Sequence, residues 1–442
     1  MSNITAIQLM PVIRFIDLFC GIGGSRVGFE AACRELGLQS ECVFSCDIKV
    51  AALTIYNKNF PRENVKPTDI TEVDEKQLPE FDVLIGGFPC QSFSSAGKRE
   101  GFNDSKGRGV LFMNIIRFAK EKKPKLMILE NVENLEAHDG GNTLRTILKY
   151  IEDAGYIHTH RVLNASLFGV PQNRKRIFIV AHLPSVKPVL LDELEPSNYN
   201  LVGSVIDHDD TTSNIPERFL TSLSRFSGTL AGKSIKDKRG GTENIHSWDL
   251  NVYGDVDDMD KTILNKLLLE RRKKSWAEQK KIVWMDGMPL TLDEIATFIT
   301  TISKDDLKSR LERLVAQKYL CMEKPKDLVD GKRVYSADGI AGYNITKGKL
   351  SFPVSKFLDP ATTCPTLTAT DACKLAIVTN GGVVRRLNRT ELKRISGFPM
   401  SFDTCETKNN MSDIYDVFGN TICPPVIQAV SRLALRNLWH IR

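Results

Sequence analysis

The feature that most constrains the fold of this chain is a series of short apolar segments without polar alternation. These segments are rich in β-branched and aromatic residues, and stretches with helical periodicity lie between them. A strand that is apolar on both sides must be buried on both faces, as in a parallel sheet covered by helices. The sequence therefore predicts an α/β fold with a doubly wound, mostly parallel sheet. The predicted strands are residues 12–19, 41–47, 81–87, 125–131 and 176–182.

The alternation of strands and helices is interrupted in the middle of the chain. It fades near residue 190, and helical periodicity returns in residues 385–399 and 415–440. We therefore expect a first domain over residues 1–190, a second domain over residues 191–380, and a return to the first domain over residues 381–442.

Residues 290–345, inside the second predicted domain, have the pattern of a helix-turn-helix followed by a wing. A short helix over 292–299 precedes a helix that Ser303 and Asp306 would cap. Two strand candidates, 319–324 and 332–336, are joined through Asp330–Gly331. The second helix of such a motif can enter the DNA major groove, so Lys304 and Lys308 are candidate DNA contacts. The alternative is a helical insertion that serves only packing or protein contact.

A glycine-rich turn follows the first predicted strand in "DLFCGIGGSRVGFE" (17–30). Gly21 and Gly23 allow a tight bend and close approach to a ligand at the N-terminus of the next helix. Asp47, after the second strand, can bind ribose hydroxyls, and Asp69 can accept from an adenine amino group. These residues predict an adenosine-containing cofactor, without distinguishing a dinucleotide from S-adenosylmethionine.

Cys90 in "GGFPCQSFSSAG" (86–97) decides between these cofactors in favour of S-adenosylmethionine. It follows a buried strand, so its thiol should project at the carboxyl edge of the sheet, beside the cofactor. As a thiolate it can act as a nucleophile. Residues 92–109 are rich in Ser, Gly and Lys, which is typical of a mobile lid over a polyanion. The alternative is a buried, unreactive cysteine.

A carboxylate and two arginines are expected at the same edge of the sheet. Glu130 ends the strand "KLMIL", where partial desolvation would raise its pKa and let it donate a proton to a ring nitrogen. Arg174 and Arg176 would anchor a carbonyl or Glu130 itself. The alternatives are an ordinary capping acid for Glu130 and a solvated charge run for the arginines.

Composition is compatible with these expectations. The 442 residues carry a net charge of +6, which permits a polyanionic partner without requiring one. The ten cysteines form no CxxC pair, so we expect reduced thiols and no metal site. The absence of a long apolar run and of a signal-peptide pattern predicts a cytoplasmic protein without a membrane partner.

The motifs together resemble those of the cytosine-C5 DNA methyltransferases of bacterial type II restriction-modification systems. The resemblance covers nearly all of residues 12–190 and 364–438, with a variable target-recognition region between. The motifs that carry it, in the family's order, are "DLFCGIGG", "GGFPCQSFS", "ENV", "QNRKRIFIV", "RRLNRTELKRISGFP" and "FGNTICPPV", with "CPTLTATDA" (364–372) closing the recognition region.

This resemblance implies a Rossmann-like fold, a reaction and a set of residues. S-adenosylmethionine would methylate C5 of a flipped cytosine in a short sequence of double-stranded DNA. Cys90 would add to C6, Glu130 would protonate N3, and Arg176 would hold O2, with Arg174 supporting the pocket. The implied cofactor residues are Asp17, Phe19, Gly21, Gly23, Asp47, Ile48, Asp69, Ile70, Asn420 and Thr421. The implied DNA contacts are Ser94, Lys98, Arg99, Thr366 and Thr368, besides Lys304 and Lys308.

The chain departs from the family's pattern at Ile48, where many relatives have an aromatic residue, so adenine stacking would rest more on Phe19. We further expect a monomer that works near the nucleoid of a bacterium or phage-infected cell. A cognate restriction endonuclease would act on the same site without direct binding. The alternatives are a transfer-RNA cytosine-C5 methyltransferase and a DNA-binding regulator with a vestigial methyltransferase core. The recognition sequence cannot be read from these residues.

Overall fold

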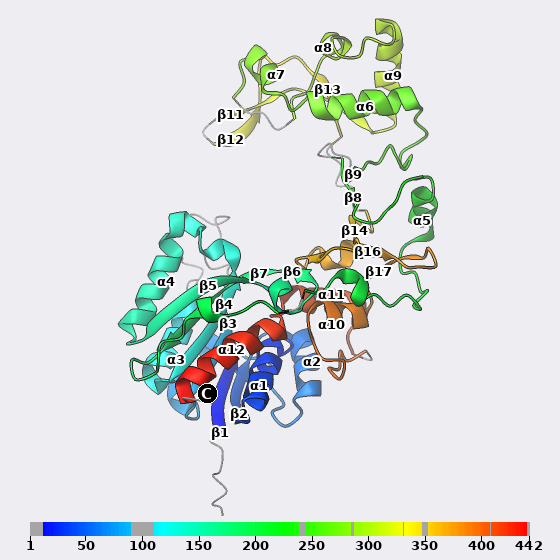
Figure 1. Ribbon diagram of the computed structural model, residues 1–442. Coiled ribbons are helices and arrows are strands. Elements are labelled where there is room, and N and C mark those ends of the chain that lie inside the picture. The colour runs from blue at the N-terminus through cyan, green and yellow to red at the C-terminus, as the bar shows by residue number, and fades with distance from the viewer. Residues whose placement is uncertain are drawn as a thin grey trace, which may run out of the picture. The chain divides into compact units, whose positions relative to one another are not determined.

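The chain forms two compact units (Figure 1). The structure is a computed structural model that describes residues 12–89, 110–197, 199–237, 244–283, 287–329, 331–346, 352–406 and 408–439. The core unit takes in Met1–Asp207, Asp359–Cys373 and Leu387–Arg442. The middle unit takes in His208–Leu358 and Lys374–Arg386. The chain therefore crosses between the units four times.

A six-stranded sheet lies at the centre of the core unit. Its order is β2-β1-β3-β4-β7-β5. The first four strands are parallel, and β7 runs antiparallel to both of its neighbours. The prediction of a mostly parallel sheet is confirmed. The strands are β1 (Val12–Leu18), β2 (Gln39–Cys46), β3 (Val83–Gly87), β4 (Leu126–Val132), β5 (Ile157–Asn164) and β7 (Lys175–His182).

Strand β5 was not predicted, because it is an edge strand with polar residues. Its sequence, IHTHRVLN, includes one fully buried position, Leu163, and otherwise half-buried or exposed side chains. The five predicted strands lie further inside the sheet or carry more buried apolar residues, which is why their sequences give a clear signal.

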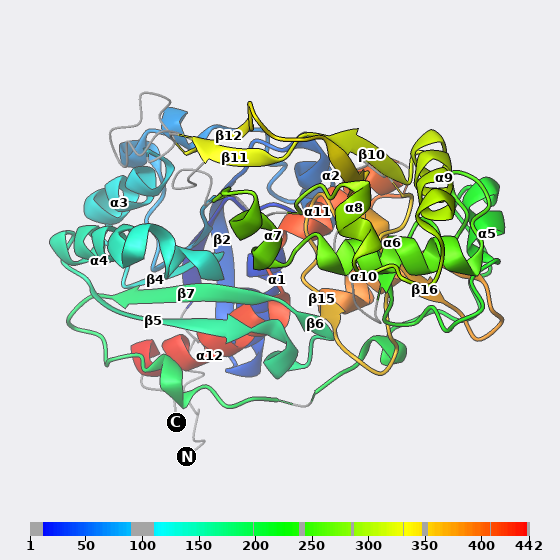
Figure 2. The same ribbon diagram turned by 90° about the horizontal axis from the view of Figure 1, so that it is seen from above.

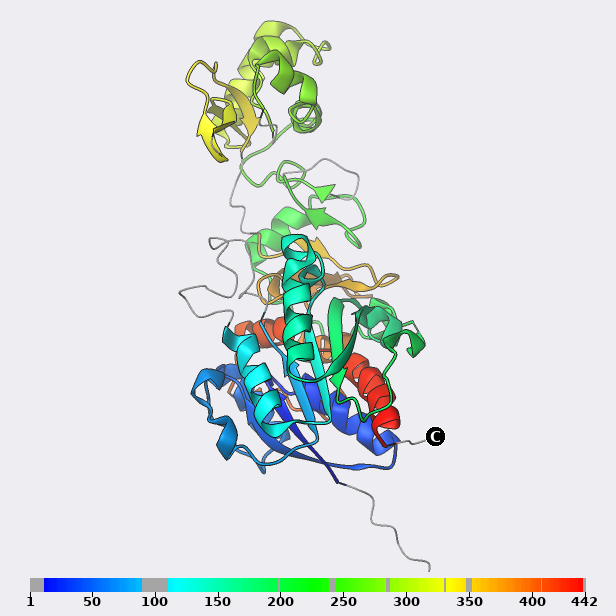
Figure 3. The ribbon, with the colours of Figure 1, turned by 90° about the vertical axis from the view of Figure 1, so that its left-hand side faces the viewer.

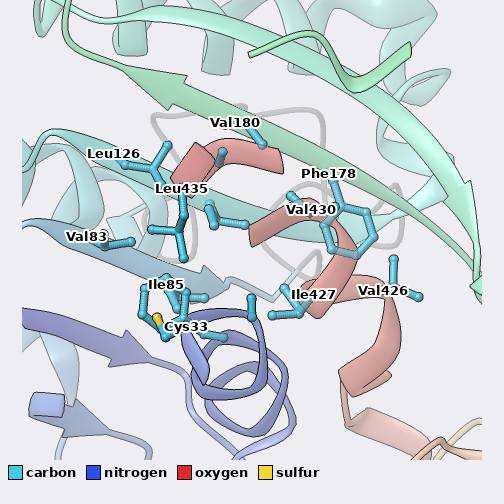
Figure 4. Packing of buried hydrophobic residues seen from close by; sticks show 14 of the residues in the cluster. Cys33, Val83, Ile85, Leu126, Phe178, Val180, Val426, Ile427, Val430 and Leu435 are labelled. Carbon is cyan, nitrogen blue, oxygen red and sulfur yellow. The ribbon is translucent and has the colours of Figure 1, made fainter. Parts of the chain in front are cut away.

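Helices cover both faces of the sheet, as the sequence predicts. Alternate residues of each strand point to opposite faces. Val83 and Ile85 share an apolar cluster with α1 (Gly24–Glu35) and α12 (Pro424–Trp439), as Figure 4 shows. Leu84 belongs to a second cluster with α3 (Val110–Lys122) and α4 (Asn142–Asp153). Figure 3 shows these two helix pairs on opposite sides of the strands.

The contact between α1 and α12 depends on glycine. A Cβ on Gly28 would collide with the carbonyl oxygen of Pro424 and lie 2.9 Å from Cβ of Ile427. A Cβ on Gly24, one turn earlier, would collide with the carbonyl oxygen of Ile422. The last helix therefore packs directly on the backbone of the first. The remaining helices of eight or more residues in the described part of the core unit are α2 (Val50–Asn59) and α11 (Met411–Asn420), and α10 (Arg389–Ile395) is shorter.

The middle unit contains two separate apolar clusters. One joins α5 (Glu217–Leu223) to a five-stranded sheet of order β17-β16-β14-β8-β9. The other joins α6 (Asp258–Glu270), α7 (Lys274–Gln279), α8 (Leu292–Ala296), α9 (Lys304–Ala316) and a pair of strands, β10 (Leu320–Glu323) and β13 (Gly342–Ile345). The short strands of the sheet are β8 (Ser234–Ile235), β9 (Asn244–Ile245), β14 (Lys356–Phe357), β16 (Leu375–Val378) and β17 (Val384–Arg386).

The two helices predicted within residues 290–345 are present as α8, which ends at Ala296 rather than at residue 299, and α9. Ser303 Oγ accepts a hydrogen bond from the Asp306 N–H at 3.1 Å, as predicted for the start of α9. The predicted strand pairing is wrong. β10 pairs with β13, whereas the hairpin that turns at Gly331 joins β11 (Lys326–Val329) to β12 (Lys332–Tyr335). Strand β11 was not predicted, because its lysine and aspartate interrupt the apolar pattern that is typical of a strand.

Every cysteine that the structure describes is a free thiol. No helix in the described ranges has both the length and the apolar character needed to cross a bilayer.

We expect Gly28→Ala to destabilise the protein by about 1–3 kcal/mol, because the added methyl group must push α12 away from α1. Urea unfolding followed by circular dichroism measures this change. Gly381→Ala is the matched control, since a Cβ there would meet only Thr379 Oγ1, at 3.9 Å. Equal midpoints for Gly28→Ala and wild type would contradict the inferred backbone contact.

Candidate active site

A glutamate and an arginine form an ion pair on adjacent strands of the core unit. Glu130 lies near the end of β4, and Arg176 lies at the start of the antiparallel strand β7. Arg176 Nε is 3.0 Å from Glu130 Oε1, and Glu130 is only 8% exposed. The sequence prediction that these two side chains share one edge of the sheet is confirmed by this geometry.

Burial raises the pKa of the Glu130 carboxyl, and the positive charges of Arg176 and Arg174 offset this only in part. The Glu130 carboxyl can therefore keep its proton at a higher pH than the carboxyl of an ordinary glutamate. Such a group can donate a proton to a basic atom of a bound substrate.

The segment that leads to Cys90 reaches the same edge. Gly87, the last residue of β3, is paired with Glu130 in the sheet register. The Asn131 side-chain amide donates a hydrogen bond of 2.9 Å to the carbonyl of Phe88, which ties the end of β4 to this segment. Cys90, Ser94, Lys98 and Arg99 lie outside the described residues. Sequence reasoning gave Asn131 no role, although its position beside Glu130 was a usable signal.

Arg174 binds backbone carbonyls rather than the Glu130 carboxylate. Its guanidinium donates to Leu367 O at 2.7 Å, to Gly419 O at 3.2 Å and to Thr421 O at 2.7 Å. Burial lowers its pKa to about 10, so it stays protonated at neutral pH. The side chain therefore holds together three parts of the core unit that are far apart in sequence.

Gln172 reinforces the same junction and was not singled out from the sequence. Its amide nitrogen donates to Ile395 O at 3.1 Å, and its oxygen accepts from the Leu367 N–H at 3.1 Å. The strand β6 (Gln172–Asn173) pairs with β15 (Cys364–Pro365). The signal that could have revealed it is its place in "QNRKR", two residues before Arg174.

Both threonines that were predicted to contact DNA lie at this junction. Thr366 donates to Asn173 O at 2.6 Å. Thr368 donates to Asp371 Oδ2 at 3.2 Å, and its backbone packs so closely on Gly419 that a Cβ there would collide with it. The structure brings Thr366 next to Arg176, since both line one cavity.

This cavity has a volume of about 430 Å³ and mostly polar walls. Lys175 and Glu133 face each other across 3.3 Å in an exposed ion pair at its rim. A small polar group could enter it and reach Arg176. The lining residues are Val132, Glu133, Asn134, Asn173, Lys175, Arg176 and Thr366.

The glycine turn after β1 is linked to the end of β2. The Gly21 N–H donates to Asp47 Oδ2 at 2.9 Å, and the Lys49 N–H donates to Asp47 Oδ1 at 2.8 Å. Gly21 has a φ of 53°, and a Cβ there would meet nothing within 4 Å, so the turn is open on that side. Gly23, also left-handed, precedes α1. Asp47 retains further acceptor capacity for a ligand hydroxyl.

Apolar side chains beside Asp47 are suited to an aromatic ligand. Ile48 is 70% exposed, so its side chain can pack on a ligand. Phe19 is half-buried and has a φ of 56°, a left-handed conformation found often at functional sites. These two residues lie where the sequence predicts the adenine end of a cofactor.

The other predicted cofactor residues have varied surroundings. Asp69 accepts from the Thr71 N–H and Oγ1 at 2.9 and 2.8 Å, and Ile70 is buried. Asn420 is exposed, and its side chain donates to Asp416 Oδ1 at 3.0 Å. Thr421 contributes its carbonyl to Arg174.

Asp17 is fully buried behind the glycine turn. Ser25 Oγ donates to Asp17 Oδ1 at 2.7 Å, and Oδ2 has no hydrogen-bond partner among the described residues. Burial raises the pKa of Asp17 to about 7. This side chain has no exposed atom that could bind a ligand directly, so the structure supports a role in shaping the turn.

Comparison with known proteins identifies the family. A family model described as C-5 cytosine-specific DNA methylase matches residues 13–435. The type II methyltransferase M.NlaIV of Neisseria lactamica is 46% identical over 440 residues, which is 97% of this chain and 100% of that protein. M.NgoBV of Neisseria gonorrhoeae is 45% identical over 438 residues, again 97% and 100%.

Solved structures agree on the fold. A putative prophage-encoded DNA modification methyltransferase from E. coli has a TM-score of 0.53 at 19% identity, covering 97% of this chain and 99% of that one. The Entamoeba histolytica methyltransferase EhMeth has a TM-score of 0.52 at 17% identity, covering 98% and 99%. The core unit thus has the Rossmann-like methyltransferase fold. The chain belongs to the C-5 cytosine-specific DNA methylase family, and it is a DNA cytosine-5-methyltransferase.

We expect Arg174→Met to destabilise the enzyme by about 2–5 kcal/mol, because three buried carbonyls lose a charged donor. Chemical unfolding measures the change. Arg432→Met is the matched control, since Arg432 makes a half-exposed ion pair with Glu35 at 2.8 Å, of the kind that contributes at most about 1 kcal/mol. Similar losses in both variants would refute the clamp role of Arg174.

The raised pKa of Asp17 predicts a specific pH dependence. Between about pH 4, its ordinary pKa, and pH 7, its folded pKa, the folded state binds more protons than the unfolded state, so stability falls as pH rises. The fall should amount to about 2–4 kcal/mol and level off above pH 7. Asp17→Asn should remove this component, so urea unfolding from pH 5 to 8 should show its stability rising relative to wild type. Parallel curves would contradict the shift.

Proposed function

We propose that the enzyme transfers a methyl group from S-adenosylmethionine to C5 of a cytosine flipped out of duplex DNA. The observation that carries this proposal is the buried Glu130, held by Arg176 and paired in the sheet with Gly87, the last residue of the strand that precedes Cys90 in the sequence. A desolvated carboxyl beside a guanidinium is suited to protonate a ring nitrogen while the base carbonyl is held.

The reaction requires covalent activation of the base, because cytosine C5 is a weak nucleophile. We propose that the Cys90 thiolate forms a bond to C6 while Glu130 gives its proton to N3, which makes C5 nucleophilic. Arg176 would hold O2 from the wall of the polar cavity. After methyl transfer, the C5 proton would pass to a base, the bond between sulfur and C6 would break, and the N3 proton would return to Glu130, which would release 5-methylcytosine and regenerate the Cys90 thiolate.

The target base must leave the duplex for these groups to reach it. Flipping costs a few kcal/mol in stacking and pairing. Ser94, Lys98 and Arg99 would contact DNA from the segment after Cys90, and Thr366 and Thr368 from the junction beside Arg176. The middle unit would read the target sequence.

The residues around the glycine turn fit an adenosine cofactor. S-adenosylmethionine, when bound, supplies the methyl group from its sulfonium. The open turn at Gly21 would admit the cofactor, Asp47 would accept from its ribose, and exposed Ile48 with Phe19 would pack on adenine. Asp69 and Ile70 would contact the adenine edge, and Asn420 and Thr421 the amino-acid end. Asp17 and Gly23 would support the turn.

We also infer the setting in which the enzyme works. Its relatives named type II methyltransferases suggest a restriction-modification system, in which a cognate endonuclease acts on the same sequence without binding the methyltransferase. The duplex substrate suggests a cytoplasmic monomer that methylates each strand in turn.

Replacing the catalytic groups tests the mechanism. Cys90→Ser should abolish methyl transfer, and wild type should form a covalent adduct with a duplex containing 5-fluorocytosine. Glu130→Gln should lower the rate by about 10²- to 10⁴-fold, the usual contribution of a general acid. Transfer of labelled methyl groups and denaturing electrophoresis measure both effects.

Glu35→Gln is the control for Glu130→Gln, since Glu35 is a half-exposed carboxylate of the core unit that lies outside this cavity and pairs with Arg432 at 2.8 Å. It should retain most of the activity. Full activity of Cys90→Ser, or no adduct with wild type, would disprove the proposed mechanism. Bisulfite sequencing of treated DNA would identify the product and its sequence context.

A further inference from the structure

We propose that Asp416 is a positioning residue for the cofactor. It orients the side-chain amide of Asn420 so that the amide oxygen accepts from the ammonium group at the amino-acid end of S-adenosylmethionine. This inference rests on the proposed function, in which Asn420 contacts that end of the cofactor. Asp416 lies on α11, and α11 runs beside α2 in the core unit (Figure 2).

The carboxylate of Asp416 holds two side chains at once. Its Oδ1 accepts a hydrogen bond of 3.0 Å from Asn420 Nδ2, and its Oδ2 pairs with Lys49 Nζ. The backbone carbonyl of Asp416 accepts from the same Nδ2 at 3.1 Å. Asp416 and Asn420 are four residues apart on one helix, where side chains are neighbours. Both hydrogens of the Asn420 amide nitrogen therefore have an acceptor on Asp416.

These contacts decide which end of the Asn420 amide is left for a ligand. The nitrogen of a side-chain amide only donates, and the oxygen only accepts. Because Asp416 offers two acceptors, the reversed amide would place oxygen against oxygen. Asn420 is exposed, and no described residue donates to its Oδ1. The oxygen is therefore the free end of the amide.

The backbone on both sides of Asn420 is fixed as well. Arg174 donates to Gly419 O at 3.2 Å and to Thr421 O at 2.7 Å. Arg174 thus holds the main chain, and Asp416 holds the side chain. The free amide oxygen is presented in one orientation before any ligand binds, which lowers the entropy cost of binding.

The segment after Asn420 contacts both the cofactor turn and the catalytic edge. A Cβ on Gly24, the first residue of α1, would lie 2.8 Å from Thr421 Oγ1. A Cβ on Gly87, the last residue of β3, would lie 3.0 Å from Ile422 Cδ1. This segment therefore lies where the amino-acid end of a cofactor bound at the glycine turn would meet the edge at which the methyl group is used.

Lys49 connects Asp416 to the residue proposed to bind the ribose. The Lys49 N–H donates to Asp47 Oδ1 at 2.8 Å, while its Nζ pairs with Asp416. Next to this contact, Asn409 Nδ2 donates to Ala51 O at 3.2 Å and ties the start of α2 to the segment before α11. One connected set of contacts therefore holds both the ribose acid and the amide.

The free amide oxygen matches one of the two charged groups at the amino-acid end of S-adenosylmethionine. That end carries an ammonium, which only donates, and a carboxylate, which only accepts. An amide oxygen can bind the ammonium and cannot bind the carboxylate. If the Asn420 amide were reversed, its nitrogen would face the ammonium and the hydrogen bond would be lost. Asp416 therefore determines which group Asn420 recognises.

The test compares two probes that share the adenosine part of the cofactor. S-adenosylhomocysteine has the amino-acid part, and 5′-methylthioadenosine lacks it. Asp416→Ala should raise the Kd for S-adenosylhomocysteine about tenfold, the loss expected for one hydrogen bond to a charged group. The Kd for 5′-methylthioadenosine should change less than about twofold, because the adenosine contacts remain. Isothermal titration calorimetry measures both constants.

Glu35→Ala is the matched control, because Glu35 also holds one cation and one amide. Its Oε1 pairs with Arg432 at 2.8 Å, and its Oε2 accepts from Gln428 Nε2 at 3.1 Å. Glu35 ends α1, about 18 Å along the helix from the glycine turn. Glu35→Ala should leave the Kd of both probes within about twofold of wild type, since half-exposed ion pairs contribute little.

Two further variants separate positioning from folding. Lys49→Met removes the ion pair and keeps the hydrogen bonds to Asn420, so it should raise the Kd for S-adenosylhomocysteine by less than Asp416→Ala does. Asp416→Asn keeps the size of the side chain and one acceptor. If Asp416→Ala fails to fold by circular dichroism, Asp416→Asn should still weaken S-adenosylhomocysteine more than 5′-methylthioadenosine.

Three results would overturn the inference. The first is an Asp416 variant that binds S-adenosylhomocysteine as wild type does. The second is an equal loss for both probes, which would indicate general damage to the site. The third is an equal loss in Glu35→Ala.

Failure of this inference can be separated from failure of the proposed function. Methyl transfer and the 5-fluorocytosine adduct are measured with wild type in parallel. If both occur and the Asp416 variants bind both probes normally, only the inference fails. If neither occurs although S-adenosylhomocysteine binds, the proposed reaction fails, and the comparison of the two probes still decides the role of Asp416.

Discussion

The core unit depends on one buried guanidinium. Arg174 donates to carbonyls of Leu367, Gly419 and Thr421, in two segments that return to the core unit from distant parts of the sequence. Because the chain leaves this unit to build the middle unit and then comes back, the returning segments need a fixed point. A charged, planar donor can satisfy several carbonyls at once, which offsets the desolvation that lowers the pKa of Arg174 to about 10.

Arg176 serves a different purpose, although only Lys175 separates it from Arg174 along the chain. Arg176 faces Glu130, whose carboxyl is desolvated by its position inside the sheet. Burial and the guanidinium act on the pKa of Glu130 in opposite directions, so the carboxyl stays in place and can still carry a proton. The same buried environment that stabilises the junction therefore prepares a group suited to proton transfer.

The sequence predicted the structure correctly where the same residues are both buried and chemically distinctive. The inner strands and the contact between Glu130 and Arg176 were predictable. It failed at the edges of the structure, where residues are under weaker constraint: β5 is a polar edge strand, and β11 contains Lys326 and Asp327 within an exposed hairpin. Lys304 and Lys308 show another limit of prediction from the sequence. Lys304 pairs with Asp293 and Lys308 lies near Glu312, and these contacts depend on helix geometry and on the position of Asp293 in the fold.

The sequence by itself determined the α/β class, the family and the types of chemical group at the catalytic edge, because strand periodicity and short motifs are local properties of the chain. Only the tertiary structure decided that Arg174 binds backbone carbonyls while Arg176 binds Glu130, and that Gln172 and Asn131 support the site. These outcomes depend on distances between residues far apart in sequence, which no local pattern specifies.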